Sequence, residues 1–553
     1  MPSAKMNRSG SGHRLKLLSS FFVACTLVPN ALALQSLTSA EVNTIFAQGA
    51  AYASSIGTPS VLAVVDREGF VLGVLDMGNR AVPLDTGLIA GAISRAGTAA
   101  FLSSNENAFT SRTAGYIIQQ HFPVGMRNTP PGPLVGVGFS NLFFSDTNRF
   151  KQIPVGGASP SAVTLTSLAD SPGGVPLYKN GELVGGVGVT GDSSPSDLSP
   201  AAFLLRSTPP ATSTAGYKIG ADTDENVALA AQNGFRPASQ IVASNVILGG
   251  FRIPYVNGNL SRLPTPTTPL PLSGAGNVTA GSVVSEYNSA NPPAITYTYA
   301  IQASPASPYT ATSLGGVPGE IRETLRDDPL RTNADPLIRN IGNAERLTQA
   351  EVRDILTLAA QKCSTVRAGI RLPVGTRAKT FISVVNNPNS QGVPPEVLGV
   401  FRVGEATMFS WDVSVQKART AVFFSNKQMA MSTRAVGFLA QRFFPPGLDG
   451  RPWGPLFGFQ DAVTLKTAPG TATFPGNTNL PNGMTIFPGG LPLYRNGELI
   501  GAIGVSGDGV DQDDLVSASG CANFLPPDAI RADKFTYRGA RLPYVKFPRN
   551  PLE

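Results

Sequence analysis

One segment of 21 residues occurs twice in this chain. PGGVPLYKNGELVGGVGVTGD, from Pro172 to Asp192, returns as PGGLPLYRNGELIGAIGVSGD, from Pro488 to Asp508. A repeat of this kind indicates a structural unit that has been duplicated. The chain of 553 residues is therefore expected to contain two copies of one domain, copy one and copy two, and each can be compared with the other.

Local signals agree between the copies. Each begins with a capping-box pattern, Thr38 to Glu41 and Thr348 to Glu351, followed by apolar residues at helical spacing. Inside the repeated segment, Asn180-Gly181 and Asn496-Gly497 stand between apolar runs, which predicts a tight β-hairpin. The other expected elements are strands at 61–65, 70–75, 381–385 and 397–401, and helices that include 94–105 and 416–427.

The similarity continues beyond the hairpin. Residues 235–256 align without a gap with 524–545, and both stretches end in Pro-Tyr-Val, so each copy carries a C-terminal extension. Between the copies, 257–343 is rich in Pro, Ser and Thr, with strand-like alternation at 295–301 and a short helical pattern at 320–326. This composition predicts a connector rather than a third core.

We expect an α+β protein of two tandem α/β/α domains arranged as a pseudo-dimer. Each domain should contain an antiparallel sheet of about five strands flanked by helices. The predicted boundaries are a signal peptide at 1–33, domain one with its extension at 34–256, the connector at 257–343, and domain two with its extension at 344–553.

The first residues have the three-part pattern of a secretory signal peptide. Basic residues such as Lys5 and Arg14 precede the apolar run 17–28 and a small-residue cleavage site at 31–33. The run is shorter than the roughly 20 residues that a permanent membrane-spanning helix needs. We expect a periplasmic or extracellular protein without a stable membrane span; a lipoprotein signal ending at Cys25 is the less favoured alternative.

The charge distribution and the cysteines limit the expected partners and the redox state of the protein. The net charge of +7 is scattered, with no Lys/Arg run interleaved with aromatic residues, so nucleic acid is not an expected partner. After signal cleavage the cysteines are Cys363 and Cys521, both in copy two. They either pair in an oxidising compartment or remain as buried thiols.

At these residues the chain resembles a known family. LTSAEV near the start, AVVDREG on the first hairpin, the SRAGTAAF helix and the repeated segment resemble the GlcG/HbpS family, also called the haem-degrading or DUF336 family. The resemblance covers about 37–192 and 347–508. It implies a binding domain for haem or a related tetrapyrrole, often assembled into oligomers, so a homo-oligomer or an exported protein partner is also expected.

Five residues are candidates for binding haem. His121 is the one histidine of the mature chain and would be a metal ligand in copy one only, because Phe443 aligns with it. Arg112 and Arg434, which match between the copies, would pair with propionates. Structural roles are the alternative for all three: a surface or internally bonded histidine, and internal ion pairs for the arginines.

The other two candidates are tyrosines. Tyr178 and Tyr494 hold the same place before the Asn-Gly turn. A tyrosine can ligate ferric haem, although packing across the hairpin is the competing interpretation.

The sequence contains no recognisable catalytic set. One mature histidine nearly excludes a His-based triad or metal cluster, and the acidic residues at 511, 513 and 514 are expected in a solvated polar loop. We therefore expect an exported haem-binding protein rather than an enzyme. The alternatives are a structural or interaction protein that has lost the ligand site, and an enzyme acting on a small organic ligand.

Overall fold

A computed structural model describes most of the chain after residue 34. Residues Gln35–Glu553 form one compact unit. The described residues are 35–77, 86–118, 122–123, 132–134, 152–154, 160–162, 169–191, 220–258, 260, 279–284, 294–298, 301–307, 309, 311–369, 372, 375–448, 450–459, 466–468, 471–473 and 479–546. The predicted signal peptide lies outside them. No helix among these residues is long and apolar enough to cross a bilayer.

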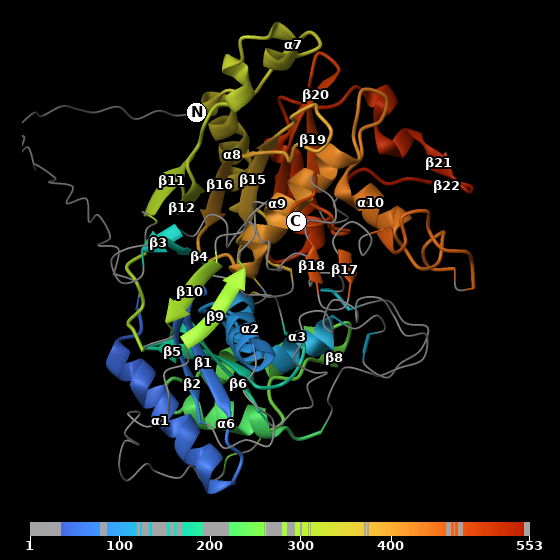
Figure 1. Ribbon diagram of the computed structural model, residues 1–553. Coiled ribbons are helices and arrows are strands. Elements are labelled where there is room, and N and C mark those ends of the chain that lie inside the picture. Colours follow the sequence, from blue (N-terminus) through green and yellow to red (C-terminus); the bar gives the residue numbers. More distant parts are fainter. Residues whose placement is uncertain are drawn as a thin grey trace, which may run out of the picture. The chain divides into compact units, whose positions relative to one another are not determined.

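Copy one is a four-stranded antiparallel sheet covered by helices on both faces. The strand order is β2-β1-β6-β5. Helix α2 packs on one face, and α1 with α6 on the other (Figure 1). The elements are α1 (Ser39–Ser55), β1 (Val61–Asp66), β2 (Val71–Asp76), α2 (Thr86–Leu102), α3 (Ser111–Ile117), β5 (Gly174–Lys179), β6 (Glu182–Thr190) and α6 (Thr223–Ala231).

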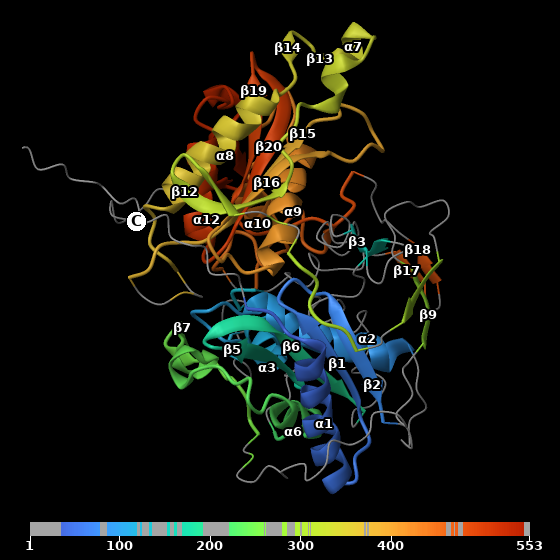
Figure 2. The ribbon, with the colours of Figure 1, turned by 90° about the vertical axis from the view of Figure 1, so that its left-hand side faces the viewer.

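Copy two repeats this plan in a larger sheet. Its six strands are ordered β11-β12-β16-β15-β20-β19, with α9 on one face and α8 with α12 on the other (Figure 2). The predicted α/β/α class is confirmed, with four and six strands around the expected five. The elements are α8 (Gln349–Cys363), β15 (Phe381–Asn386), β16 (Val397–Val403), α9 (Phe409–Phe423), α10 (Thr433–Leu439), β19 (Gly490–Arg495), β20 (Glu498–Ser506) and α12 (Val510–Gly520).

The local predictions hold in both copies. Thr38 and Thr348 cap α1 and α8 in complete capping boxes with Glu41 and Glu351. At the hairpin tips, Asn180 and Gly181 have φ of 53° and 83°, and Asn496 and Gly497 have 53° and 79°. Two consecutive positive φ angles are what a type I′ turn requires, which explains the Asn-Gly choice.

The connector contributes to the folded structure. Strands β11 (Ala311–Leu314) and β12 (Val317–Glu323) form a hairpin, and β12 pairs with β16 of copy two. The helix expected at 320–326 is therefore wrong, because pairing with a sheet edge overrides the local helical pattern. The strand expected near 295–301 is confirmed as β10 (Ala294–Thr298), which pairs with β9 (Thr279–Val284).

The two extensions fold alike. Each has two short 3₁₀ turns followed by a two-residue hairpin. The elements are η3 (Ser239–Ile241), η4 (Ala243–Asn245), β7 (Ile247–Leu248) and β8 (Phe251–Arg252), matched by η6 (Asp528–Ile530), η7 (Ala532–Lys534), β21 (Thr536–Tyr537) and β22 (Ala540–Arg541). The remaining short elements are β3 (Gln152–Pro154), β4 (Pro160–Ala162), η5 (Pro329–Thr332), α7 (Pro336–Arg339), β13 (Asn340–Ile341), β14 (Ala344–Glu345), β17 (Lys466–Ala468) and β18 (Thr471–Thr473).

A buried ionic cluster joins copy one, the connector and copy two. The fully buried Arg322 of β12 donates to both carboxylate oxygens of Glu68, in the β1–β2 turn, at 2.6 and 3.0 Å. Glu320 pairs with Arg322 and with Arg402 of β16. The Tyr309 ring lies 4.1 Å from the Arg322 guanidinium carbon. Because two cations and two carboxylates balance here, charge can be buried between the three parts.

Candidate functional site

The matched arginines are held inside each copy by acidic residues. In copy one, Arg112 of α3 is buried and donates to the two carboxylate oxygens of Glu225 at 2.7 and 3.0 Å. The amide N–H of Asn257, just after Pro-Tyr-Val, donates to the same carboxylate at 2.9 Å. Arg112 therefore secures the C-terminal extension against α6.

Copy two repeats this arrangement with a second acid. Arg434 of α10 pairs with Asp514 and, at 2.7 Å, with Asp511. The amide N–H of Lys546 donates to Asp514 at 3.2 Å. Burial alone would lower the pKa of Arg434, but these two carboxylates raise it above its ordinary value. The arginine remains fully charged and engaged within its own copy.

The acidic residues of this network overturn one expectation. Residues 511–514 do not lie in a solvated loop; they belong to the first turns of α12, and Asp513 and Asp514 are buried. Their charges are compensated by basic residues that are distant in the sequence, Lys417 and Arg434. A signal was present, because Asp222, Asp224 and Glu225 precede them at a constant spacing of 289 residues, the spacing of the two extensions.

Each copy contains a second ion pair, formed by residues at matching positions. Arg95 of α2 pairs with Asp224 at 2.6 Å in copy one. Lys417 of α9 pairs with Asp513 at 2.8 Å in copy two, and its ammonium also donates to the Val505 carbonyl at 2.7 Å. The same position therefore carries a guanidinium in one copy and a smaller ammonium in the other.

The tyrosines serve the hairpins. The buried Tyr178 donates its hydroxyl hydrogen to the Ser104 carbonyl at 2.7 Å, and Tyr494 does the same to Asn426 at 2.7 Å. Burial raises the pKa of both phenols above the ordinary value. A phenolate, the form that ligates ferric iron, is therefore disfavoured at both positions.

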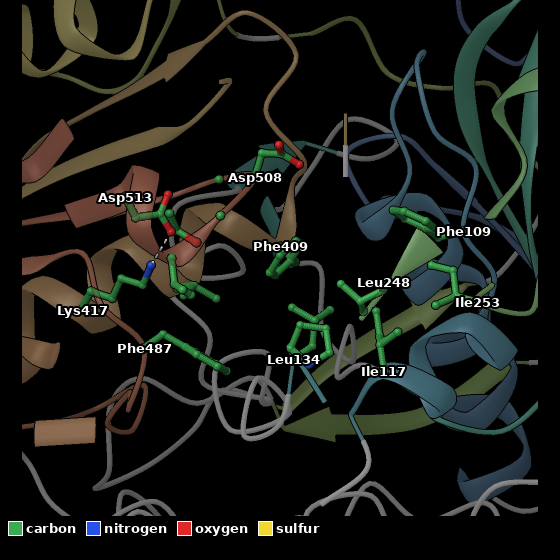
Figure 3. Close-up of a pocket in the computed structure, with 16 residues that line it drawn as sticks. Phe109, Ile117, Leu134, Leu248, Ile253, Phe409, Lys417, Phe487, Asp508 and Asp513 are labelled. Carbon is green, nitrogen blue, oxygen red and sulfur yellow. Dashed lines mark hydrogen bonds and ion pairs between the residues drawn. The ribbon is translucent and has the colours of Figure 1, made fainter. Parts of the chain in front are cut away.

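A small cavity lies where residues of the two copies meet (Figure 3). Its volume is about 50 Å³. In Figure 3 apolar side chains of copy one, including Ile117, Leu134 and Ile253, face Lys417 and Asp513 of copy two across the space. The described residues that line it are Phe109, Ile117, Pro133, Leu134, Leu248, Ile253, Phe409, Val413, Lys417, Phe487, Ser506, Gly507, Asp508, Gly509, Val510 and Asp513.

The cavity has one apolar wall and one charged end. The charged end of the lining contains two carboxylates, Asp508 and Asp513, and one ammonium, Lys417, which is paired with Asp513. A further carboxylate, brought by a ligand, would be repelled there. No group of three or more metal-ligating side chains occurs within the described ranges.

The two copies match one family model. The model for the HbpS-like family, described as haem degrading protein HbpS-like, aligns with residues 37–203 and 379–522, more than half of the chain. This chain belongs to the HbpS-like family. No curated protein matches it.

Several solved structures are similar to one HbpS-like copy. A PduOC:heme complex is 20% identical, covering 32% of this chain and 94% of that one, with a TM-score of 0.22. Klebsiella pneumoniae protein ORFY, of the DUF336 family, is 23% identical, with coverages of 33% and 94% and a TM-score of 0.23. HbpS itself is 18% identical, with coverages of 33% and 93% and a TM-score of 0.21.

Three residues that the sequence analysis singled out remain, namely His121 and the two cysteines. His121 lies outside the described residues, so its role as a ligand stays a prediction. Cys363 and Cys521 are both buried free thiols, the second of the two alternatives left open by the sequence. Burial raises the pKa of Cys363 to about 12, which keeps this thiol protonated and inert.

Proposed function

We propose that this protein is an exported, non-catalytic binding protein whose ligand is haem or a related tetrapyrrole. Membership of the HbpS-like family, seen in both copies, is the observation that carries the proposal. Export is supported by the signal-peptide pattern at 1–33. The absence of a nucleophile elbow, HExxH or CxxC pattern from the sequence supports binding rather than catalysis.

Four of the five candidate residues are not available to bind haem, because they make contacts within their own copies. Arg112 and Arg434 are already paired with carboxylates of their own copies, and Tyr178 and Tyr494 donate to backbone carbonyls. A ligand would have to break these contacts. We therefore propose His121, which occurs in copy one alone, as the iron ligand.

The cavity between the copies does not fit a tetrapyrrole either. Its volume of about 50 Å³ is far below the roughly 300–1,000 Å³ of pockets that enclose drug-sized ligands. Propionates would also meet Asp508 and Asp513 at the charged end. A proposed haem site is therefore sought near His121.

A haem titration of the mature protein, followed by its Soret band, tests the proposal. We expect a shifted Soret band at one haem per chain, lost in His121→Ala and retained in Tyr494→Phe. The absence of any shift in the wild type would overturn haem binding. Bleaching of bound haem by a reductant and oxygen would instead contradict the non-catalytic assignment.

One structural observation favours a second function. The residues that match between the copies, Arg112 with Arg434 and Tyr178 with Tyr494, all stabilise the domain itself. This is what a structural or interaction protein with a lost ligand site would retain. A protein that gives no Soret shift but forms a defined assembly in analytical ultracentrifugation would support this alternative.

A further inference from the structure

Copy two has an exposed apolar loop, described at 445–448 and 450–459, which we term the aromatic loop. Trp453 is 64% exposed and Leu448 is 49% exposed on this loop. The Phe457 ring lies 5.2 Å from that of Trp453. Aromatic side chains bury about 150–250 Å² when packed, so an indole left in water forgoes much hydrophobic stabilisation. Clustered exposure of this kind marks an interaction surface.

Arginines surround the aromatic loop. Arg538, on the β21–β22 hairpin, donates to the Trp453 carbonyl at 2.8 Å and stacks 5.1 Å from the Tyr537 ring centroid. Arg442 stacks 5.6 Å from the Phe443 ring, and the exposed Arg451 lies two residues before Trp453. None of these three arginines forms an ion pair with another described residue. Their charges remain available to an anionic partner.

Copy one lacks these side chains at the aligned positions. At the spacing of 322 residues, Gln120, Thr129 and Pro131 stand in place of Arg442, Arg451 and Trp453. Gly249 aligns with Arg538 at the spacing of 289. Trp453 and these three arginines are therefore specific to copy two and are not needed for the shared fold.

We propose that the aromatic loop, with Arg442, Arg451 and Arg538, docks copy two onto the surface of an anionic lipid bilayer. Tryptophan prefers the bilayer interface, where its ring is half in hydrocarbon and its N–H remains hydrated. Arginine is attracted by anionic headgroups in the same layer. The two together give the reversible binding typical of peripheral proteins.

The tryptophan content makes this proposal directly measurable. The chain has two tryptophans; Trp411 is fully buried, so a change in emission on adding vesicles reports on Trp453. With phosphatidylcholine vesicles containing phosphatidylglycerol, we expect a shift to shorter wavelength and reduced acrylamide quenching. High salt should reverse both changes because the attraction is electrostatic. Pure phosphatidylcholine should give neither change.

Variants separate the contributions of the loop. In co-sedimentation with the anionic vesicles, Trp453→Ala should weaken binding by about tenfold or more, and Arg538→Gln on the order of fivefold. Arg252→Gln on the β8 strand of copy one removes the same charge elsewhere and should leave binding unchanged. Because Trp453 is exposed, its replacement should not change the urea midpoint, which verifies folding.

Three results would overturn the proposal. One is no emission change with anionic vesicles, and another is an equal change with pure phosphatidylcholine. The third is a blue shift that grows with protein concentration in the absence of lipid, together with dimers in analytical ultracentrifugation. That last result would assign the aromatic loop to a second copy of the chain instead.

Discussion

Copy one and copy two share an ion pair between an arginine and an acidic residue of α6 or α12, which we call the ionic frame. The two copies differ in how completely this ion pair is buried. In copy one, Arg112 and Glu225 are both about 1% exposed. In copy two, Arg434 is 19% exposed and is shared between Asp514, which is fully buried, and Asp511. In each copy the ionic frame connects α6 or α12 to the C-terminal extension. The matched residues therefore have a structural role.

The other differences between the copies lie outside that frame. Copy two gains two strands from the connector, has Lys417 where copy one has Arg95, and carries the aromatic loop. His121 and its counterpart Phe443 also differ. Any ligand or partner site of this protein is therefore expected to be asymmetric, with the repeat providing a common scaffold.

The largest effect is expected from breaking the link between the copies. Arg322→Ala removes a fully buried guanidinium and leaves Glu68 with a weaker partner, so the free energy of unfolding should fall by about 3–5 kcal/mol. Urea unfolding followed by circular dichroism measures this change. Arg326→Ala, at an ion pair that is 44% and 39% exposed, is the control and should cost no more than about 1 kcal/mol. Equal losses in the two variants would show that the cluster does not stabilise the fold.

The ionic frame should respond differently in the two copies. Glu225→Ala leaves Arg112 buried without its carboxylate, which should cost about 3–5 kcal/mol. Asp514→Ala should cost about 1–3 kcal/mol, because Arg434 keeps Asp511 and some contact with water. Unfolding midpoints of the two variants test the order. A larger loss in Asp514→Ala would show that the arginine of copy one does not depend more strongly on its carboxylate than the arginine of copy two.

The two hairpin turns should lose the same amount of stability when their glycine is replaced. Gly181→Ala and Gly497→Ala place a side chain at φ of 83° and 79°, which should cost about 1–2 kcal/mol in each copy. Gly220→Ala, where a methyl group would meet no neighbour within 4 Å, is the control and should be almost neutral. Thermal unfolding of the three variants is sufficient to compare them. Unequal costs at the two turns would mean that the copies differ even in their most similar segment.

The smallest effect concerns acid stability at the helix starts. Burial raises the pKa of Glu351, but hydrogen bonds from Arg495 and Thr348 lower it overall; for Glu41 the same balance involves Lys179 and Thr38. A carboxyl whose pKa is lowered by folding adds stability above its unfolded pKa, near 4.5, and this stability is lost as pH falls through the folded pKa.

Substitution with Gln should therefore reduce the acid sensitivity of the protein. In Glu351→Gln and Glu41→Gln the loss of stability between about pH 5 and pH 3 should become shallower by roughly 1 kcal/mol or less, since both groups are partly exposed. Urea midpoints at several pH values measure the slope. A steeper slope in either variant would mean that the carboxyl is not stabilised in its charged form.

The sequence predicted the elements whose causes are local. The capping boxes of Thr38 and Thr348 and the Asn-Gly turns follow from hydrogen bonds and φ angles within four residues. The fold class followed from the repeat and from the alternation of helical and strand patterns. The connector strand β12 could not be found in this way, because its partner β16 lies about 80 residues further along the chain.

The site was harder to predict for the same reason. Asp513 and Asp514 look solvated in sequence and are buried in the structure, because Lys417 and Arg434 reach them from other helices. Comparing charges across the copies, acid with acid and base with base, would have identified both ion pairs. The cavity and the ionic cluster of Arg322 are formed by residues from different parts of the chain, and no local pattern marks them.

Duplicating a domain also duplicates its exposed sheet edges, which are templates for aggregation. Here the connector contacts one edge of each copy's sheet. Its Gln302 amide N–H donates to the Leu72 carbonyl on the β2 edge of copy one, and its β12 strand pairs with β16 of copy two. The connector thus occupies backbone groups that could otherwise pair with a strand of another chain.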